Sequence, residues 1–262
     1  MLKIKTIFKI IFSKLGSSDA KEAFSKFNIS NKYERIYHYH IRKTGGTSIN
    51  RAIMNYLYSD SENTYSELAS KWINTRVIYN NRITVGWNKA LLEQGYYHFG
   101  FSHIPQHEIV LPKDTFTFTI LRDPIERIYS HYNMLKYYSE NNIAHPVRQN
   151  EENWLGNNII DFVNQMPKSH LRRQLYMFSN HYDVEEALSN LQKINRIFFT
   201  SDLARAIGIL SDGFKFNLKI RHDKKSSRSK KLSHDENKII TNLLKNEIIF
   251  YETAKNKYYE VY

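Results

Sequence analysis

Two short segments of this chain combine basic and hydroxyl side chains in the way that binding an anion requires. The first is RKTGGTS, residues 42–48, which follows a short apolar run. Its basic residues supply positive charge, its hydroxyl groups can donate hydrogen bonds, and its glycines allow close approach to the backbone. Where such a loop leads from a strand into a helix, the backbone N–H groups and the helix dipole favour the same anion. We therefore predict an anion site formed by Arg42, Lys43, Thr44, Gly45, Gly46, Thr47 and Ser48.

This loop differs from the common nucleotide-phosphate loop G-x-x-x-x-G-K-[ST]. Lys43 precedes the two glycines, whereas the lysine of that pattern follows its last glycine. A glycine turn beside a solvated lysine would have the same sequence. The loop alone therefore leaves open which anion is bound.

The second segment is LRDPIERIYSHY. It follows a predicted strand at 115–121, and Asp123-Pro124 is typical of the N-cap and first position of a helix. Arg122 is then at the end of the strand, and Ser130 is roughly 10 Å along the helix at about 1.5 Å per residue. An extended arginine covers much of this gap, so we expect Arg122 and Ser130 to hold one phosphate together.

Apolar periodicity and turn residues predict strands that alternate with helices along most of the chain. We expect strands at 36–41, 76–79, within 96–105, at 115–121 and at 196–200. Helices are expected at 48–58, from Asp123 onward, and at 157–166, 184–194 and 203–210. A capping box at Ser233–Glu236 begins a long C-terminal helical region. This alternation predicts an α/β sandwich with a mainly parallel sheet.

The composition favours a partner that carries negative charge. Among 262 residues, 38 are Lys or Arg and 26 are Asp or Glu, which gives a formal net charge of +12. There is no cysteine, so disulfides, cysteine-bound zinc and a thiol nucleophile are excluded. The sequence has no zinc-finger, RNA-recognition or helix-turn-helix pattern, and we expect neither nucleic acid nor a metal as a partner.

Residues 1–34 are predicted to be an N-terminal amphipathic helix and a polar linker, with 16–34 either loosely structured or a short helix, preceding one domain at 35–262. Lysines flank one apolar face of MLKIKTIFKIIFSKLG. This pattern is typical both of a helix in a membrane surface and of a terminal helix docked on the domain. The lysines do not fit a secretory signal, and no apolar run approaches the roughly 20 residues of a membrane span. We expect a cytoplasmic protein, with residues 2–15 as the segment for any peripheral contact with the inner face of the membrane.

The two anion segments, in this order and each after a strand, resemble the 5′-phosphosulfate loop and the 3′-phosphate motif of sulfotransferases. The likeness runs from Ile36 to the segment NEIIFYETAKNKY and is closest to the carbohydrate type, particularly the heparan sulfate and uronyl 2-O-sulfotransferase branch. It implies a P-loop-like three-layer sandwich with a mainly parallel central sheet flanked by helices. The family usually has Pro where Arg42 stands, which puts the rigidity of the loop in question.

The resemblance implies 3′-phosphoadenosine 5′-phosphosulfate as the sulfuryl donor and adenosine 3′,5′-bisphosphate as the product, without a metal. Lys43 and the loop N–H groups would contact the 5′-phosphate, and Arg122 and Ser130 would hold the 3′-phosphate. Lys43 could also stabilise the negative charge that grows on the bridging oxygen as the S–O bond breaks. The family closes over the nucleotide where this chain has a charged loop at 219–231, which would bring in Ser226, Ser227 and Arg228.

In-line transfer to a sugar hydroxyl needs a base, and the segment GYYHFGFSHIP holds two histidines that resemble the histidine segment of the family. A histidine with a pKa near 6.5 suits this role at neutral pH. We predict His103 first, then His98, then the carboxylate of Glu108. His38 and His40 are on the strand before the loop and are predicted to be structural.

A basic cleft would suit an acidic polysaccharide, with a uronic acid or an existing sulfate as the recognised group. Arg172 and Arg173 are expected to face this acceptor. Two alternatives are a P-loop nucleotide kinase and a non-catalytic basic protein that binds polyanions. A kinase would need Mg²⁺ ligands and a lysine after the glycines, and neither arrangement is evident.

Overall fold

The computed structural model of the protein describes residues 11–12, 17–58, 76–219 and 232–259. In these residues seven strands form one sheet in the order β1-β3-β4-β5-β2-β6-β7. The strands are β1 (Ile11–Phe12), β2 (Arg35–Tyr39), β3 (Arg76–Tyr79), β4 (Arg82–Gly86), β5 (Phe99–Ser102), β6 (Thr115–Leu121) and β7 (Arg196–Phe199). The five strands from β4 to β7 in this order are parallel, while β3 is antiparallel to β4 and β1 is antiparallel to β3. The predicted mainly parallel sheet is confirmed.

The helices before and around the first half of the sheet are α1 (Ser17–Ser25), α2 (Gly46–Tyr58), α4 (Lys89–Gln94) and the short η1 (Gln106–Glu108). A helical region follows β6 and contains α5 (Pro124–Glu140), α6 (Pro146–Glu151), η2 (Glu152–Trp154), α7 (Ile159–Gln165), α8 (Lys168–Leu171), α9 (Arg173–Phe178) and α10 (Val184–Leu191). The remaining helices are η3 (Thr200–Asp202), α11 (Leu203–Phe214), α12 (His234–Leu243) and α13 (Lys245–Tyr258). None of these helices is long and apolar enough to cross a membrane.

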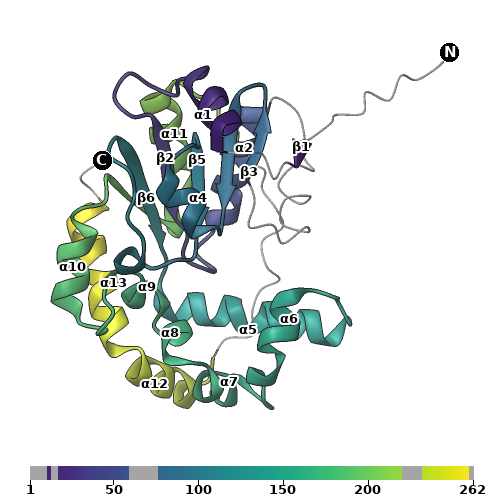
Figure 1. Cartoon of the computed structure of the whole chain (residues 1–262). Helices are drawn as coiled ribbons and strands as arrows, with labels where there is room; N and C mark the ends of the chain where they lie inside the picture. The colour runs from purple at the N-terminus through teal and green to yellow at the C-terminus, as the bar shows by residue number, and fades with distance from the viewer. Residues whose placement is uncertain (1–10, 13–16, 59–75, 220–231, 260–262) are drawn as a thin grey trace.

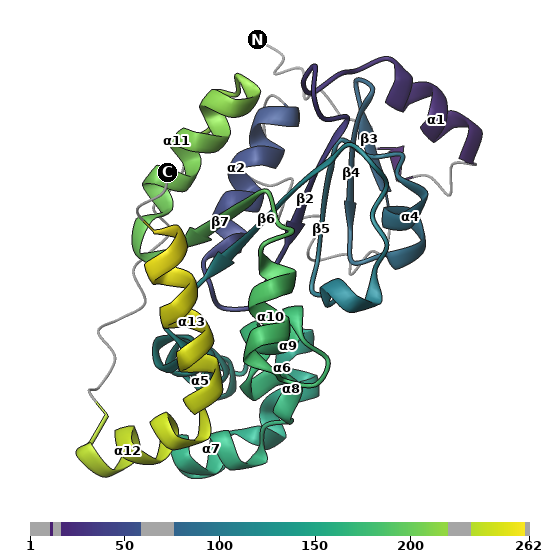
Figure 2. The same cartoon turned by 90° about the vertical axis from the view of Figure 1, so that its left-hand side faces the viewer.

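The sheet is the middle of three layers (Figures 1 and 2). Successive side chains of a strand point to opposite faces, and on β2 Ile36 packs with α2 and α11 while Tyr37 packs with α9, α10 and α13. A third apolar cluster joins α5, α7 and α12 outside the two faces of the sheet. Both faces of the central strands are therefore buried, as parallel sheets require, and the predicted three-layer α/β sandwich is confirmed.

A buried ion pair links the helix that follows β6 to the C-terminal helix α13. Arg127 on α5 and Glu247 on α13 are 3.3 Å apart, and their side chains are 1% and 0% exposed. Glu247 also accepts hydrogen bonds from the backbone N–H of Leu175 (3.4 Å) and from the side chain of Gln174 (3.5 Å). Gln174 in turn bonds both the N–H and the C=O of Arg122, at 2.8 Å each. This network fixes the backbone at the end of β6, where the second anion segment begins.

Local signals predicted most elements near the two anion segments. Asp123 caps α5 by accepting a hydrogen bond from the N–H of Glu126, Pro124 follows it, and the capping box at Ser233–Glu236 is present. The predicted strands at 36–41, 76–79, 115–121 and 196–200 correspond to β2, β3, β6 and β7 within two residues at each end.

The N-terminal segment departs from its prediction at Ile11 and Phe12. Ile11–Phe12 is not helical but pairs with β3 as an edge strand, which occupies backbone groups of β3 that would otherwise be unpaired. The remaining residues of the predicted helix at 2–15 lie outside the described residues. The segment 16–34, predicted as a polar linker or a short helix, contains the helix α1, whose Ala20 and Ala23 are buried.

Gly46, at the start of α2, is needed for packing. A Cβ atom at this position would lie 2.5 Å from Cδ2 of His40 and 2.6 Å from Cε1 of His38. We predict that Gly46→Ala lowers the free energy of unfolding by about 1–3 kcal/mol, because the buried rings cannot move aside freely. Gly208→Ala is the matched control, since an added Cβ on α11 meets nothing within 4 Å. It should raise stability by about 0.5–1 kcal/mol through helix propensity. Urea denaturation of both variants measures this, and equal effects would contradict the close packing of Gly46.

Candidate active site

The candidate site is at the carboxyl ends of four neighbouring parallel strands. The loop 42–48 follows β2, His103 follows β5, Arg122 follows β6 and Thr200 follows β7. Because β5, β2, β6 and β7 are adjacent and parallel, these groups meet at one edge of the sheet. Ligands of open α/β sheets bind at this edge.

The loop 42–48 has the backbone shape of an anion site. Lys43 (φ 68°) and Gly45 (φ 85°) are both in the left-handed region, on either side of Thr44, and α2 begins at Gly46. Such alternation turns successive N–H groups toward one side, and the first turn of a helix leaves its own N–H groups without helical partners. The Thr44 hydroxyl is buried and donates to the carbonyl of Ile41 (2.9 Å), so it serves the loop and not a ligand.

The two anion segments are in direct contact. Nη1 of Arg122 donates to the backbone carbonyl of Lys43 at 3.2 Å, and Nε of Arg122 is 3.4 Å from a carboxylate oxygen of Glu126. The Lys43 ammonium lies 3.2 Å from the sulfur of Met134 on α5. Burial, together with the positive charges of Arg42 and Arg122, lowers the pKa of Lys43 to about 8. The lysine is still mainly protonated at pH 7, and an anion would relieve the repulsion around it.

Thr200 ties the loop to β6. Its hydroxyl lies 2.6 Å from the carbonyl of Thr44 and 3.2 Å from that of Leu121. The sequence predicted only the end of a strand here, since a single threonine after an apolar run carries no further local signal. Thr200 therefore joins the site as a positioning residue that the sequence did not indicate.

Arg42 points to a partner that the sequence did not indicate. Its guanidinium binds both carboxylate oxygens of Glu151 on α6, and Nε2 of His131 on α5 is 2.7 Å from the same carboxylate. Burial raises the pKa of Glu151, but the hydrogen bonds from His131 and Arg42 outweigh it and lower the pKa to about 2. The side chain predicted to bind the donor is instead engaged in holding the loop to α6.

His103 follows β5, and one hydrogen bond fixes the tautomer of its ring. Its Nδ1 is 2.5 Å from the carbonyl of His40. A carbonyl only accepts, so Nδ1 carries the hydrogen and Nε2 is the basic nitrogen. Burial, followed by the charge of Arg42, lowers the pKa of His103 to about 3, and the bond to His40 only partly opposes this. The ring is therefore neutral at pH 7.

His98 and Glu108 differ from His103 in their surroundings. His98 precedes β5 whereas His103 follows it, which puts them roughly 16 Å apart at about 3.3 Å per residue. His98 is fully buried, and its ring nitrogens bond the N–H of Ile83 (3.0 Å) and the carbonyl of Phe27 (3.0 Å). The structure therefore does not support His98 as the base. Glu108 is exposed on η1 and accepts a hydrogen bond from the Tyr176 hydroxyl at 3.1 Å.

His38 and His40 form a stack under the loop. The His38 ring is 4.3 Å from that of Phe118 and 4.9 Å from that of His40, and its Nδ1 is 2.7 Å from Oδ1 of the buried Asn50. Burial lowers the pKa of His38 to about 3 and also lowers that of His40. Both rings are neutral and packed, which agrees with a structural role.

The remaining predicted residues divide into three groups. Arg173 donates to the carbonyl of His103, whereas Arg172 donates to the carbonyl of Leu243 at the end of α12. Only Arg173 is thus next to the site. Ser130 is half-buried on α5. Ser226, Ser227 and Arg228 lie outside the described residues, so their predicted contacts with the donor stay predictions.

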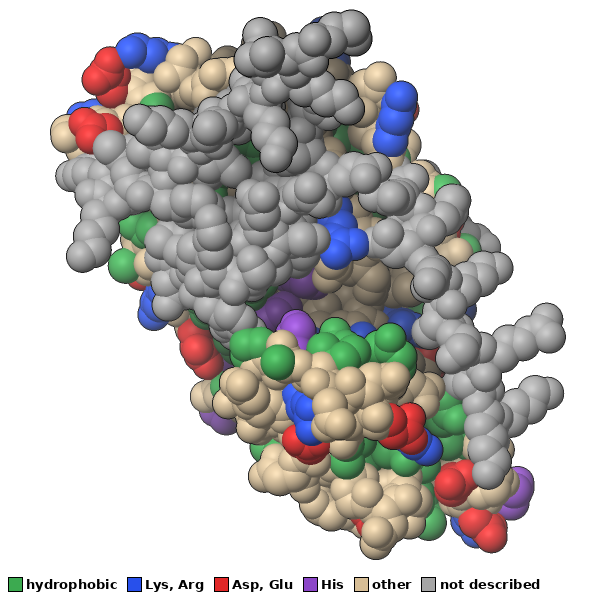
Figure 3. Space-filling view, turned by 90° about the vertical axis from the view of Figure 1, so that its right-hand side faces the viewer, with side chains coloured by type: hydrophobic (Ala, Val, Ile, Leu, Met, Phe, Trp, Pro, Cys, Tyr) green, Lys and Arg blue, Asp and Glu red, His purple; other side chains and the backbone are tan. Residues whose placement is uncertain are grey.

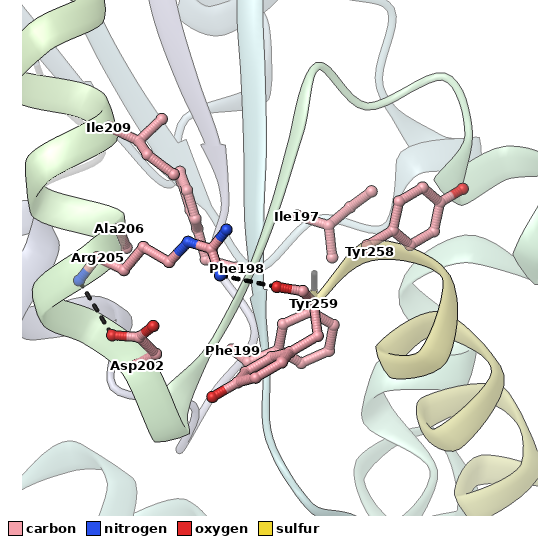
Figure 4. Close-up of a pocket in the computed structure, with 9 residues that line it drawn as sticks. All are labelled: Ile197, Phe198, Phe199, Asp202, Arg205, Ala206, Ile209, Tyr258 and Tyr259. Atoms are coloured by element: carbon pink, nitrogen blue, oxygen red, sulfur yellow. Dashed lines mark hydrogen bonds between the residues drawn. The ribbon is translucent and has the colours of Figure 1, made fainter. Parts of the chain in front are cut away.

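Figure 3 shows histidine and basic side chains together in a hollow across the middle of the molecule. A separate cavity, lined by residues of β7, α11 and α13, is too small for a nucleotide (Figure 4). Its volume is about 20 Å³, which suffices for one water molecule. It is lined by residues such as Phe198 and Arg205, whose Nη1 donates to the carbonyl of Tyr259 at 2.8 Å. Within the described part of the chain, no three His, Asp or Glu side chains gather as a metal site.

Comparison with known proteins identifies the family of the chain. A solved structure with a similar chain is the crystal structure of a sulfotransferase from Alicyclobacillus acidocaldarius, with 14% identity and a TM-score of 0.34 over 92% of this chain and 91% of that chain. No protein with a curated description matches the chain. The family model described as "Sulfotransferase family" matches residues 25–251, which include both anion segments and every strand from β2 to β7. The chain belongs to the sulfotransferase family.

Proposed function

We propose that this sulfotransferase moves a sulfuryl group from 3′-phosphoadenosine 5′-phosphosulfate to a hydroxyl of an acidic carbohydrate. The observation that carries the proposal is the 3.2 Å contact between the Arg122 guanidinium and the Lys43 carbonyl. It joins two segments that the sequence predicts to bind two different phosphates. One ligand with phosphates at both ends of a ribose would bridge them. The likeness to the heparan sulfate and uronyl 2-O branch is part of this proposal.

The described residues fit such a donor. The 5′-phosphosulfate would lie against the left-handed loop and the start of α2, with Lys43 beside the bridging oxygen. Arg122, which leaves β6 next to this loop, and Ser130 on the same helix would take the 3′-phosphate. The Arg42–Glu151 ion pair holds the loop on its far side without occupying Lys43.

The proposed reaction is an in-line displacement at sulfur. The acceptor oxygen forms a new S–O bond while the bond from sulfur to the 5′-phosphate oxygen breaks. The products are a sulfate ester and adenosine 3′,5′-bisphosphate, and the hydroxyl proton passes to Nε2 of His103. Lys43 stabilises the negative charge on the departing phosphate oxygen, which is a transition-state effect.

Burial first, and then the positive charges of Arg42 and Arg173, lower the pKa of His103. A bound donor brings several negative charges and raises this pKa, since an opposite charge favours the protonated ring. His103 is thus neutral before the donor binds and more basic afterwards. This order suits a base that must accept a proton only in the full complex.

The acceptor is proposed to be acidic because the groups near His103 are basic. Arg173 bonds the His103 carbonyl, and the chain as a whole carries a formal charge of +12. A carboxylate or sulfate on the sugar would pair with the planar guanidinium. Membership of the sulfotransferase family removes the nucleotide kinase as an alternative. The non-catalytic polyanion binder is decided by the His103 experiment below.

Replacing Arg122 tests the donor site. We predict that Arg122→Ala weakens binding of adenosine 3′,5′-bisphosphate at least tenfold, or about 1.4 kcal/mol, because a phosphate loses its bidentate partner. Isothermal titration calorimetry measures this. Arg172→Ala is the matched control, since Arg172 donates to the Leu243 carbonyl away from the loop. Equal affinities in the two variants, or no binding by a folded wild type, would remove the proposed donor.

Binding of the nucleotide should depend on pH through Lys43. Its pKa is lowered to about 8, so the fraction of free protein with a charged Lys43 falls as the pH rises through 8. Above pH 8 we predict that affinity for adenosine 3′,5′-bisphosphate falls by up to about tenfold per pH unit. In Lys43→Arg the guanidinium stays charged, and the decline should vanish. The same decline in both proteins, measured calorimetrically between pH 7 and 9.5, would assign it to another group.

Replacing His103 separates catalysis from binding. We predict that His103→Gln lowers turnover of the donor by about 100- to 10,000-fold while nucleotide affinity stays near that of the wild type. His98→Gln should keep turnover and lose stability instead, because its ring bonds the backbone inside the fold. Turnover is followed as adenosine 3′,5′-bisphosphate released in the presence of acidic polysaccharides. Full activity in His103→Gln would exclude His103 as the base, and absence of turnover in every folded protein would favour a binding role.

A further inference from the structure

We propose that a strip of aromatic and basic side chains beside His103 binds an acidic saccharide chain on one side of the sugar that reacts. The strip consists of Arg173, Tyr176, Tyr182 and Lys168, and we call it the acceptor strip. The inference rests on the proposed function, because it concerns the acceptor of that reaction. It goes further by naming where the neighbouring sugars lie and what chemistry recognises them.

The acceptor strip is continuous from the candidate base outward. The Arg173 guanidinium bonds the carbonyl of His103, and its Cζ lies 5.7 Å from the centre of the Tyr176 ring. The rings of Tyr176 and Tyr182 are stacked, with centres 5.4 Å apart and planes 23° apart. The Lys168 ammonium lies 4.2 Å from the centre of the Tyr182 ring. Cation, ring, ring and cation thus follow one another without a gap.

These side chains are at the surface. Lys168 is exposed, and Arg173, Tyr176 and Tyr182 are half-buried. Four such side chains could also pack together merely as the outer part of the hydrophobic core. Each of them, however, keeps solvent-accessible surface that a ligand can contact. The Nε atom of Arg173 is buried and has no hydrogen-bond partner among the described residues. This guanidinium is therefore not fully satisfied by the protein.

The backbone holds Tyr182 in place at an energetic cost. Its φ of 59° is in the left-handed region, which is rare for a bulky residue. The N–H of Tyr182 donates to the carbonyl of Ser179, and the Ser179 hydroxyl accepts a bond from the N–H of Asp183 at 2.9 Å. Such strained positions cluster at binding and catalytic sites. Here the strain keeps the Tyr182 ring beside Tyr176 and under Lys168.

The chemistry of the acceptor strip fits an acidic sugar chain. The apolar C–H face of a pyranose ring can lie on an aromatic ring, as in many small-molecule sites lined by aromatic side chains. A carboxylate or sulfate on that sugar can pair with Arg173 at one end and Lys168 at the other. Glu108, which accepts a bond from the Tyr176 hydroxyl, and the adjacent His107, whose ring is 5.3 Å from that of Tyr176, flank the middle of the strip.

Single-stranded nucleic acid also combines stacking rings with negative charge. The position of the acceptor strip favours the saccharide, because it begins at the carbonyl of the residue proposed to deprotonate the acceptor hydroxyl. An acceptor sugar at His103 would place the next sugars of the same chain along the strip. The enzyme would then prefer long acidic chains to single sugars.

The test uses full-length protein and oligogalacturonate as the acidic probe, with maltohexaose as the neutral one. We expect affinity for oligogalacturonate to rise with chain length and maltohexaose to bind much more weakly. Lys168→Gln and Tyr182→Leu should each weaken oligogalacturonate binding by about tenfold, because the first removes a charge that pairs with the ligand and the second removes a ring that the sugar lies on. Tyr182→Leu removes the aromatic ring but keeps an apolar side chain, and the melting temperature of each variant is measured first. Lys168 is exposed, so Lys168→Gln is expected to fold and tests the acceptor strip even if Tyr182→Leu does not fold.

Lys32→Gln is the matched control. Lys32 is also an exposed lysine over a tyrosine ring, 5.2 Å from the centre of Tyr33, but it precedes β2 at the opposite end of the sheet. It should bind oligogalacturonate as the wild type does. Equal losses in Lys32→Gln and Lys168→Gln would overturn the acceptor strip in favour of general attraction by the basic surface. Equal or tighter binding of poly(dT), lost in the same strip variants, would overturn the saccharide as its ligand.

Calorimetry with adenosine 3′,5′-bisphosphate on the same proteins keeps the two proposals separate. The strip variants should retain the nucleotide affinity of the wild type, because neither residue contacts the loop 42–48 or Arg122. A wild type that binds oligogalacturonate through the strip but no nucleotide would reject the proposed donor and keep the strip. If the wild type binds the nucleotide normally and the strip variants bind oligogalacturonate as the wild type does, the proposed donor is kept and the acceptor strip is rejected.

Discussion

The ion pair between Arg127 and Glu247 is the interaction on which the arrangement of the site depends. It is fully buried and joins α5 to α13, two helices that are distant in the sequence. A buried pair contributes little net stability, because removal of both charges from water offsets most of their attraction. An unpaired partner would be far more costly, so the two helices are bound to a single relative position. Gln174 transmits that position to Arg122 by bonding both backbone groups of the residue.

The site is at the ends of strands, where contacts between distant parts of the chain can fix each loop in one position. Each strand brings one short segment to the edge of the sheet, and side chains from other segments then fix it. Thr200 holds the loop to β6, Arg122 holds it from the second anion segment, and Arg42 holds it to α6 through Glu151. Each of these bonds crosses between elements that are not consecutive in the chain. The loop therefore has its shape before any ligand arrives.

The fold class and the two anion segments could be predicted because their signals are local. A run of β-branched and aromatic residues followed by Asp123-Pro124 identifies both the end of β6 and the start of α5. The sequence ranked His103 before His98 but could not show at which end of β5 each histidine lies, because that depends on which residues form the strand. Four strand residues separate the two rings and send them to opposite ends of the sheet. Short helices such as α8 and α9 escaped prediction because four to six residues show no period.

Single buried polar residues were also beyond prediction, with one exception. Nothing local distinguishes Thr200 or Gln174 from surface residues of the same type, since their partners come from other elements. Glu247 does carry a signal, because it shares the spacing of the apolar residues on the buried face of α13, Phe250, Tyr251 and Ala254. A carboxylate on such a face is expected to have a buried partner. The sequence cannot say that the partner is Arg127.

The ion pair between Arg42 and Glu151 has a thermodynamic consequence. Pro fixes a loop by restricting one dihedral angle, whereas Arg42 fixes this loop by pairing its side chain with Glu151 on α6. The loss of conformational entropy is then met when the protein folds and not when the ligand binds. A ligand that binds a loop already held in place does not have to offset the entropy of ordering that loop, so its affinity is higher. Because the side chains of this pair are only 15% and 7% exposed, dissolved salt screens it weakly, and the anchor holds over a wide range of ionic strength.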